Sequence, residues 1–216
     1  MNHLRPVPAP PEPPPAPRRR GFVGSLRHAW DGLLTACAQR NMKLHLVSAV
    51  LVGLVGSGVR LGLAEKVSLI FCVVLVFFAE ILNTALEALV DLHTEDFREL
   101  AKTTKDAAAA AVLVLALGTV VIFAAICVAE WHVIAQSGPQ IFRQALVGSP
   151  FAACVGLLLA DGRRARWLDH LLFAVGLALW TLLWMKTVSS VFTTLTGSLL
   201  FVAWRARLRH RPVEAG

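Results

Sequence analysis

Charged residues are scarce in this sequence. Asp, Glu, Lys and Arg together make up 16% of the 216 residues, whereas hydrophobic residues make up 56%. A soluble domain of this size would not stay in solution with so little charge over so much apolar surface. The composition therefore excludes an ordinary soluble protein and predicts an integral membrane protein.

Motifs that would indicate a soluble kinase or a metal site are also missing. The sequence has neither a phosphate-binding G-x-x-x-x-G-K-[ST] loop nor the H-R-D and D-F-G motifs of protein kinases, which excludes those folds as the source of an activity. The cysteines lack metal-ligand spacing, and we interpret them as buried small apolar residues without disulfides. They are Cys37, Cys72, Cys127 and Cys154.

The N-terminal segment lacks the apolar core of a cleavable signal peptide. Residues 1–20 hold eight of the 11 prolines and end in three arginines. This composition predicts a disordered, extended arm.

Apolar runs recur along the rest of the chain, each near the length of about 20 residues with which a helix crosses a hydrocarbon core. They cover residues 44–63, 67–90, 107–129, 144–160, 168–185 and 187–204. We therefore predict an all-α membrane protein with six transmembrane helices, of which the run 144–160 is short and contains Pro150. Before these runs, the apolar residues between Phe22 and Cys37 share one face, which predicts an amphipathic helix in the membrane interface.

The formal net charge of +7 reflects topology and not a nucleic-acid partner. With the N-terminus inside, seventeen of the 21 Lys and Arg residues fall in cytoplasmic segments, and only Arg60, Lys66, Arg143 and Lys186 lie outside. This is the bias of the positive-inside rule. It predicts a multi-pass protein with both termini in the cytoplasm.

One polar face interrupts the second apolar run. At about 100° per residue, Glu80, Asn83, Thr84, Glu87 and Asp91 fall at about 0°, 300°, 40°, 340° and 20° around a helix. Ionisable groups inside a membrane are costly and mark functional sites by default. We interpret this face as one wall of a site that opens on the cytosol, with a polar seam that only joins helices as the alternative.

Cations follow in the segment between the second and third runs. Lys102 and Lys105 can hold a polyphosphate while the carboxylates hold Mg²⁺. A solvated charge run is the alternative for residues 95–102, whereas Lys105 and Asp106 open a membrane span, where a charge pair is costlier. Together with the polar face, these residues suit phosphoryl transfer to a group at the membrane surface.

Residues 22–129 resemble the prokaryotic diacylglycerol kinase family. The family signature E-x-x-N-[ST]-[SA]-x-E-x-x-x-D stands here as Glu80, Asn83, Thr84, Ala85, Glu87 and Asp91; the pair Lys105-Asp106 follows it, and Arg40, Asn41 and His45 precede it in the pattern R-N-x-x-x-H. The resemblance implies a surface helix and three transmembrane helices per protomer. It also implies a homotrimer with composite active sites, ATP as co-substrate and Mg²⁺ as cofactor.

The resemblance implies a role for each matched residue. Glu80 is the expected catalytic base toward the lipid hydroxyl, and Glu87 is the expected Mg²⁺ ligand. The expected ATP site comprises Glu87, Asp96, Phe97, Arg98, Lys105 and Asp106, with Asn83, Asp91, Arg40 and Asn41 in support. Gln39 stands where many members place a second metal-binding glutamate, and its neutral amide binds Mg²⁺ less well.

The expected function is ATP-dependent phosphorylation of diacylglycerol to phosphatidic acid at the cytoplasmic face of a bacterial inner membrane. Undecaprenol is the alternative lipid. Two alternatives come from other classes: an ion-coupled transporter that uses Glu80 and Glu87 as relay groups, and a non-catalytic membrane scaffold.

The expected organisation has three parts: an arm over residues 1–20, a lipid-kinase core over 21–130, and a transmembrane extension of unknown role over 131–216. A lipid-facing buttress or a partner-binding module are the roles we expect for the extension. Because the matched positions end before residue 130, deletion of residues 136–216 is expected to leave a kinase-competent core.

Overall fold

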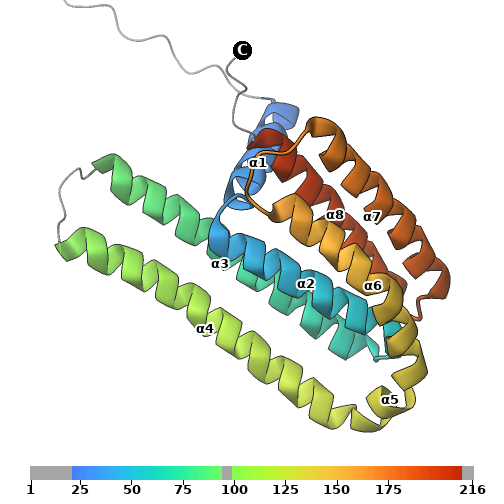
Figure 1. Ribbon diagram of the computed structural model, residues 1–216. Helices are drawn as coiled ribbons and strands as arrows, with labels where there is room; N and C mark the ends of the chain where they lie inside the picture. The colour runs from blue at the N-terminus through green and yellow to red at the C-terminus, as the bar shows by residue number, and fades with distance from the viewer. Residues whose placement is uncertain (1–20, 94–98, 211–216) are drawn as a thin grey trace, which may run out of the picture.

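The computed structural model describes residues 21–93 and 99–210, and within them the chain is all helix and connecting turns (Figure 1). The proline-rich arm and the predicted ATP-site residues Asp96, Phe97 and Arg98 lie outside the described residues. The helices are α1 (Phe22–Ala36), α2 (Arg40–Gly58), α3 (Leu63–His93), α4 (Glu99–Ala129), α5 (Trp131–Gln136), α6 (Gly138–Leu159), α7 (Arg166–Lys186) and α8 (Ser190–Arg209). The predicted all-α membrane architecture is confirmed.

Five helices in the described part are long and apolar enough to cross a membrane: α2, α3, α4, α6 and α7. The prediction of six spans is wrong by this measure, because α8 does not reach the same hydropathy. Its 20 residues include Thr193, Thr194 and Thr196, and its last turn carries Arg207 and Arg209. Hydroxyl groups and cations make transfer into hydrocarbon less favourable. The short run 144–160, in contrast, lies almost entirely within α6, which continues through Pro150.

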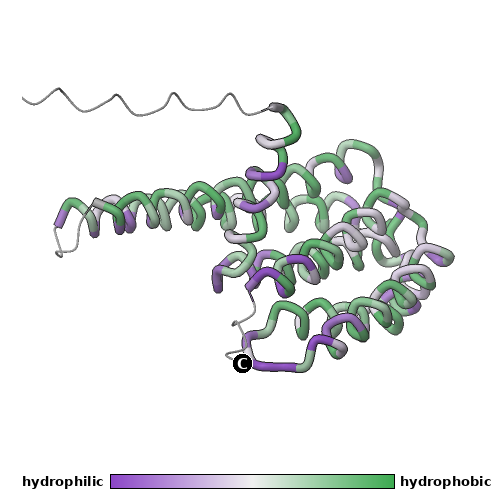
Figure 2. Tube along the Cα trace, turned by 90° about the horizontal axis from the view of Figure 1, so that it is seen from above, coloured by the Kyte–Doolittle hydropathy of each residue, from purple (hydrophilic) through white to green (hydrophobic). Residues whose placement is uncertain are grey.

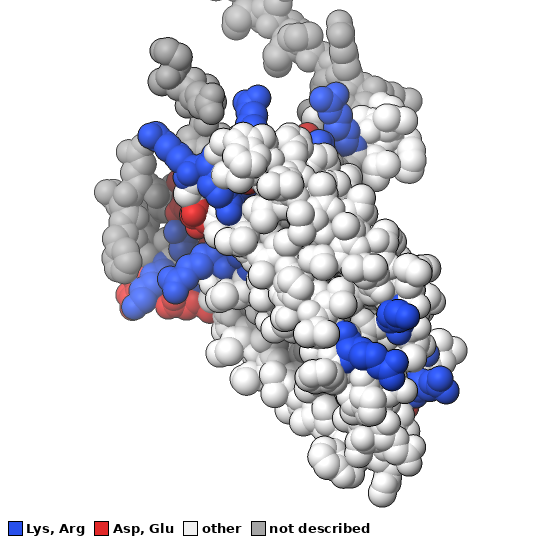
Figure 3. All heavy atoms as spheres, turned by 45° about the vertical axis from the view of Figure 1, so that its right-hand side comes forward, with Lys and Arg blue, Asp and Glu red and all other residues white. Residues whose placement is uncertain are grey.

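Apolar and polar residues separate along the molecule. Figure 2 shows hydrophobic residues along the lengths of the helices and hydrophilic residues mainly near their ends. In the face shown in Figure 3, the Lys and Arg side chains gather toward two ends, and the surface between them carries other residues. This is the pattern expected of helices whose middle parts lie in hydrocarbon.

The amphipathic segment after the arm forms helix α1, as predicted. Phe22, Val23 and Leu26 in its first half are exposed, whereas Leu34 and Ala36 near its end are buried. The guanidinium of Arg209 in α8 forms an ion pair with Asp31, and the ring Nε2 of His210 lies 3.0 Å from the carbonyl oxygen of Leu34. Helix α1 is therefore held against the end of α8.

Helix α2 packs closely on the C-terminal part of the chain. A Cβ placed at Gly53 would lie 2.6 Å from Thr196 Cγ2, and one placed at Gly56 would lie 2.6 Å from Phe192 Cδ2. The glycines therefore let α2 and α8 approach, as small residues do between membrane helices. On another side, α2 runs antiparallel to α6, with Lys43 Nζ 2.5 Å from Asp161 Oδ1 just beyond the end of α6.

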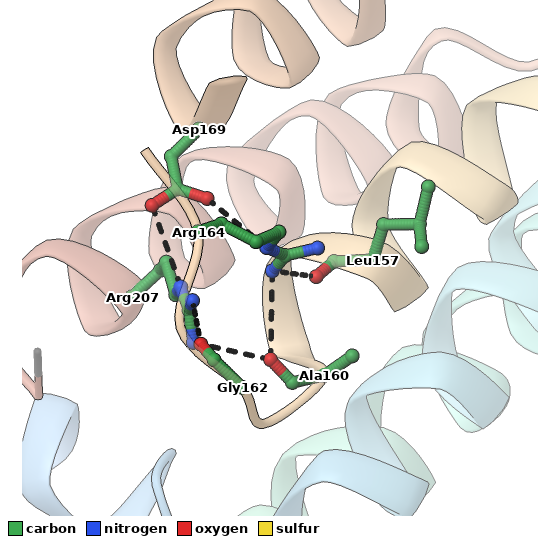
Figure 4. A network of polar contacts seen from close by, with 6 residues as sticks. All are labelled: Leu157, Ala160, Gly162, Arg164, Asp169 and Arg207. Carbon is green, nitrogen blue, oxygen red and sulfur yellow. Dashed lines mark hydrogen bonds and ion pairs between the residues drawn. The ribbon is translucent and has the colours of Figure 1, made fainter. Parts of the chain in front are cut away.

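A buried carboxylate fixes the connection between α6 and α7 (Figure 4). Asp169, in the first turn of α7, is 0% exposed, and its oxygens lie 3.4 Å from Arg207 Nε and 3.6 Å from Arg164 Nε. Arg207 also donates to the carbonyl oxygens of Ala160 and Gly162. Gly162 has a φ of +131°, a conformation that favours glycine. The network joins α8 to this turn by charge-assisted hydrogen bonds.

Three of the four cysteines are buried, as predicted, and Cys127 is not. All four are free; Cys37, Cys72 and Cys154 are buried and Cys127 is half-buried. Burial raises the pKa of the Cys37 thiol, just after α1, to about 11. A thiol that stays protonated at neutral pH is a poor nucleophile and a poor metal ligand.

Helices α3 and α4 form a long hairpin at one side of the molecule (Figure 1). Only 6% of the most apolar stretch of α4 is buried, against 50% in α2. The main core combines residues of α1, α2, α3, α6, α7 and α8, and within the described residues α4 contributes none of its buried members. Helix α4 is thus the most thinly packed of the predicted spans.

Candidate active site

The polar face of α3 lies where the periodicity predicts it, and its burial decreases toward the end of the helix. Glu80 is 2% exposed and Asn83 is 6% exposed, Glu87 is half-buried, and Asp91 is exposed. Thr84 donates its hydroxyl to the carbonyl oxygen of Glu80, 2.9 Å away, so it satisfies its own helix. The deepest carboxylate of the face is therefore Glu80.

Glu80 has a partner on a neighbouring helix. Its Oε1 lies 3.2 Å from Nε2 of His45, which is in the second turn of α2. An imidazole N–H that donates to this carboxylate fixes its orientation, because a buried carboxylate needs hydrogen bonds to offset the loss of water. The R-N-x-x-x-H motif contains His45, but the motif alone predicts no role for it. The missed signal is the spacing of Asn41 and His45, four residues apart on one face of α2.

Asn83 and Glu87, one helical turn apart, are joined by a second contact. Asn83 Nδ2 donates to Glu87 Oε1 at 3.0 Å. Among the residues that the structure describes, Asn83 Oδ1 is then buried without a hydrogen-bond partner. A buried acceptor with no partner is unusual in a folded protein. It is an oxygen available to a hydroxyl group or to a hard cation such as Mg²⁺.

An ion pair joins α3 and α4 near the connection between these two helices. Lys105 Nζ lies 2.6 Å from Asp91 Oδ1, which brings α4 to the last carboxylate of the polar face. Both side chains are accessible to solvent, so the pair is open to a ligand. Asp106, the next residue of α4, is exposed. Lys105, predicted for nucleotide binding, thus contacts Asp91, predicted to support it. Asp106, also predicted for nucleotide binding, follows Lys105 in the sequence.

A pocket of about 230 Å³ lies between α2, α3 and α4. Asn41 and His45 line it from α2, and Glu80 and Asn83 line it from α3. The opposite wall is α4 between Ala109 and Ala116. The pocket combines a few polar groups on one side with small and apolar residues on the other, as binding sites for amphipathic ligands do.

The predicted metal and supporting residues at the start of α2 are less closely gathered. Gln39 precedes the first turn of α2, and both Gln39 and Arg40 are exposed, whereas Asn41 reaches the pocket. In residues 21–93 and 99–210, no group of three or more His, Cys, Asp or Glu residues could hold a metal by itself. Mg²⁺ in phosphoryl-transfer sites needs only one or two carboxylates in addition to phosphate oxygens and water. The half-buried carboxylate of Glu87 fits that smaller demand.

Comparison with known proteins identifies relatives of the helix α1 to α4 region. The family model for prokaryotic diacylglycerol kinase matches residues 27–127. A diacylglycerol kinase of Synechocystis sp. is 41% identical over 100 residues, which are 45% of this chain and 57% of that protein. The undecaprenol kinase of Bacillus subtilis is 39% identical over 98 residues, 45% of this chain and 77% of that protein.

A more distant relative is matched over most of its own length. The diacylglycerol kinase of Escherichia coli K12 is 30% identical over 111 residues, which are 51% of this chain and 88% of that protein. No solved structure matches the chain. The region after α4 lies outside the family match.

Proposed function

Because the chain belongs to the prokaryotic diacylglycerol kinase family, we propose that it is a lipid kinase that transfers the γ-phosphoryl group of ATP to diacylglycerol, giving phosphatidic acid. Phosphorylation of undecaprenol is equally supported, since relatives of both names match the same region. The observation that carries the proposal is the buried Glu80 carboxylate, oriented by His45 beside a pocket between three helices.

Glu80 is the proposed general base. The lipid hydroxyl enters the pocket and donates to the Glu80 carboxylate while its oxygen attacks the γ-phosphorus of ATP. The proton passes to Glu80, the new P–O bond forms, and ADP leaves. A positioned base of this kind contributes about 10²–10⁴-fold to the rate. His45 keeps the carboxylate in place, and Asn83 Oδ1 is a further acceptor near the same hydroxyl.

The nucleotide lies toward the accessible end of α3 in this proposal. Glu87 and Glu80 are seven residues apart, about 10 Å along the helix axis at about 1.5 Å per residue, so they serve different groups. Glu87 holds Mg²⁺, which screens the phosphate charge when bound. Lys105 and Asp106, with Asp96, Phe97 and Arg98, form the remainder of the ATP site. Asp91 orients Lys105 through their ion pair.

The proposed assembly is a homotrimer in a bacterial inner membrane, with both termini in the cytoplasm. The exposed apolar surface of α4 supports further helix contacts, because α4 is the wall of the pocket with the least packing in one chain. The distribution of Lys and Arg supports the orientation.

The test of the function is phosphoryl transfer by the purified full-length protein in detergent. Radiolabelled ATP and Mg²⁺ are supplied with diacylglycerol or with undecaprenol, and the labelled lipid is identified by chromatography. The proposal expects label in phosphatidic acid. Label in undecaprenyl phosphate alone would show that undecaprenol, and not diacylglycerol, is the substrate. The absence of label from both lipids and from every lipid extract would contradict the lipid-kinase proposal.

A second test addresses the nucleotide. Glu87→Gln removes a carboxylate and keeps the size of the side chain, so we expect weaker Mg²⁺-dependent binding of ATP. Binding is measured with a fluorescent ATP analogue at several Mg²⁺ concentrations. Unchanged Mg²⁺ dependence would remove Glu87 from the metal site.

A further inference from the structure

A second groove, lined mainly by apolar residues, lies between α2 and α6. Its volume is about 150 Å³. Leu51, Leu54 and Val55 line it from α2. The α6 wall is made mainly of small residues, among them Ala145 and Ser149. Because these side chains are short, a groove remains between the two helices. Larger side chains at these positions would fill it.

The groove and the candidate active site lie along the same face of α2. Asn41, Leu44, Ser48, Leu51 and Val55 are all exposed, and at about 100° per residue they fall within an arc of about 80°. The first two of them line the pocket beside Glu80, and the last two line the groove. One exposed strip of α2 therefore connects the polar pocket with the apolar groove.

The depth of the groove matches the reach of a lipid tail. Leu51 and Val55 lie six and ten residues beyond His45, which is about 9–15 Å along the helix at about 1.5 Å per residue. The chains of one leaflet fill about half of a hydrocarbon core about 30 Å thick. A lipid with its hydroxyl at Glu80 can thus place a long tail along the whole groove, whereas a short tail covers less of it.

We propose that this groove binds the hydrocarbon tail of the lipid whose hydroxyl is phosphorylated. This inference rests on the proposed function and extends it to the region outside the family match. Helix α6 then contributes directly to substrate binding, by selecting lipids with long tails. Because the exposed strip of α2 leads from the polar pocket to the groove, the substrate is favoured as the occupant over any other membrane lipid.

Photolabelling tests the occupant without requiring turnover. The full-length protein in phosphatidylcholine nanodiscs is exposed to diacylglycerol that carries a diazirine at the end of one long tail, and labelled peptides are mapped by mass spectrometry. The proposal expects label in α6 between Ile141 and Ala152, displaced by excess long-chain diacylglycerol. No label there, or label that excess phosphatidylcholine displaces equally, would overturn it.

Kinetics test whether the groove affects catalysis. Ala145→Phe and Ser149→Phe fill the groove, and Leu146→Phe adds bulk to an exposed position on the same helix that does not line it. Loss of room for one methylene in an apolar pocket changes selectivity by about 10–200-fold. We therefore expect the filled variants to raise KM at least about tenfold for dioleoylglycerol, to raise it less for dioctanoylglycerol and to leave kcat unchanged.

The outcomes separate the two proposals. Equal effects of all three variants on both lipids, or no effect on either, would overturn the tail groove while lipid phosphorylation by the wild type stands. A wild type that phosphorylates no lipid would contradict the proposed function, and the photolabelling result would still decide whether α6 binds the tail.

Discussion

The α3–α4 hairpin and the helices that pack around α2 differ in what they contribute. The hairpin carries Glu80, Asn83, Glu87 and Lys105, yet little of α4 is buried. The group of α1, α2, α6, α7 and α8 carries most of the buried core and only one edge of the pocket, made by Asn41, Leu44 and His45. The site thus lies at the boundary between a thinly packed helix and a firmly packed one.

The C-terminal helices α6, α7 and α8 do not form a separate unit, because they share a buried core with α2. Met42, Leu46 and Val50 of α2 belong to the same buried core as residues of α6 and α8. Two hydrogen bonds also join Ser57 at the end of α2 to Thr187 and Val188. Helix α2 positions His45, so the helices that hold α2 also hold one wall of the site. This shared core argues against the expectation that a chain without residues 136–216 keeps a competent site.

Truncation is the strongest test of the comparison. Ending the chain after Gln136 removes α6, α7 and α8 and leaves the glycine-lined face of α2 without its close partners. We expect loss of folded, monodisperse protein and of kinase activity, measured by size-exclusion chromatography in detergent and by phosphoryl transfer. Deletion of residues 1–20 is the control. A truncated chain that folds and phosphorylates lipid would show that the hairpin and α2 suffice.

A change on the hairpin should separate chemistry from packing. Glu80→Gln keeps a carbonyl oxygen that can accept from His45 but removes the base, so we expect kcat to fall by about 10²–10⁴-fold. Nucleotide affinity and thermal unfolding should change little. Glu65→Gln, in the first turn of the same helix, is the matched control and should keep full activity. Weaker ATP binding with normal kcat at saturation would place Glu80 in the nucleotide site.

A change in the packed group should do the reverse. Phe192 in α8 is 0% exposed and contacts Gly56, so Phe192→Ala leaves a cavity and is expected to destabilise the protein by about 3–5 kcal/mol. Phe71→Ala, at an exposed position of α3, is the control. Thermal unfolding in detergent measures both. If the two variants unfold alike, the α2–α8 contact does not carry the stability assigned to it.

The smallest effect is expected at the ion pair between α2 and the α6–α7 connection. The hydrogen bond and charge of Lys43 lower the pKa of Asp161 below its ordinary value of 3.8. The pair therefore stabilises the fold above pH 3.8, and its contribution is lost as the pH falls through the lowered pKa. Asp161→Asn should slightly lower the unfolding temperature at neutral pH and leave it unchanged in strong acid. A larger loss in acid than at neutral pH would contradict this assignment.

Composition and helical periodicity are enough to predict the membrane class and the polar face of the site. A helix repeats every 3.6 residues, so the spacing of Glu80, Asn83 and Glu87 was enough to place them on one side and to predict that it faces protein. The signature on the same residues was enough to indicate the family.

Which helix covers which face depends on packing in three dimensions and does not follow from periodicity. The pairing of Glu80 with His45 joins residues 35 positions apart, and periodicity fixes the direction of a side chain but not the helix that meets it. The glycines of α2 predict a close neighbour, yet any helix with a suitable surface could fill that place, and here it is α8. The same reason explains why the shared core was not foreseen: apolar runs show that helices can enter a membrane, and their packing depends on shapes that meet only after folding.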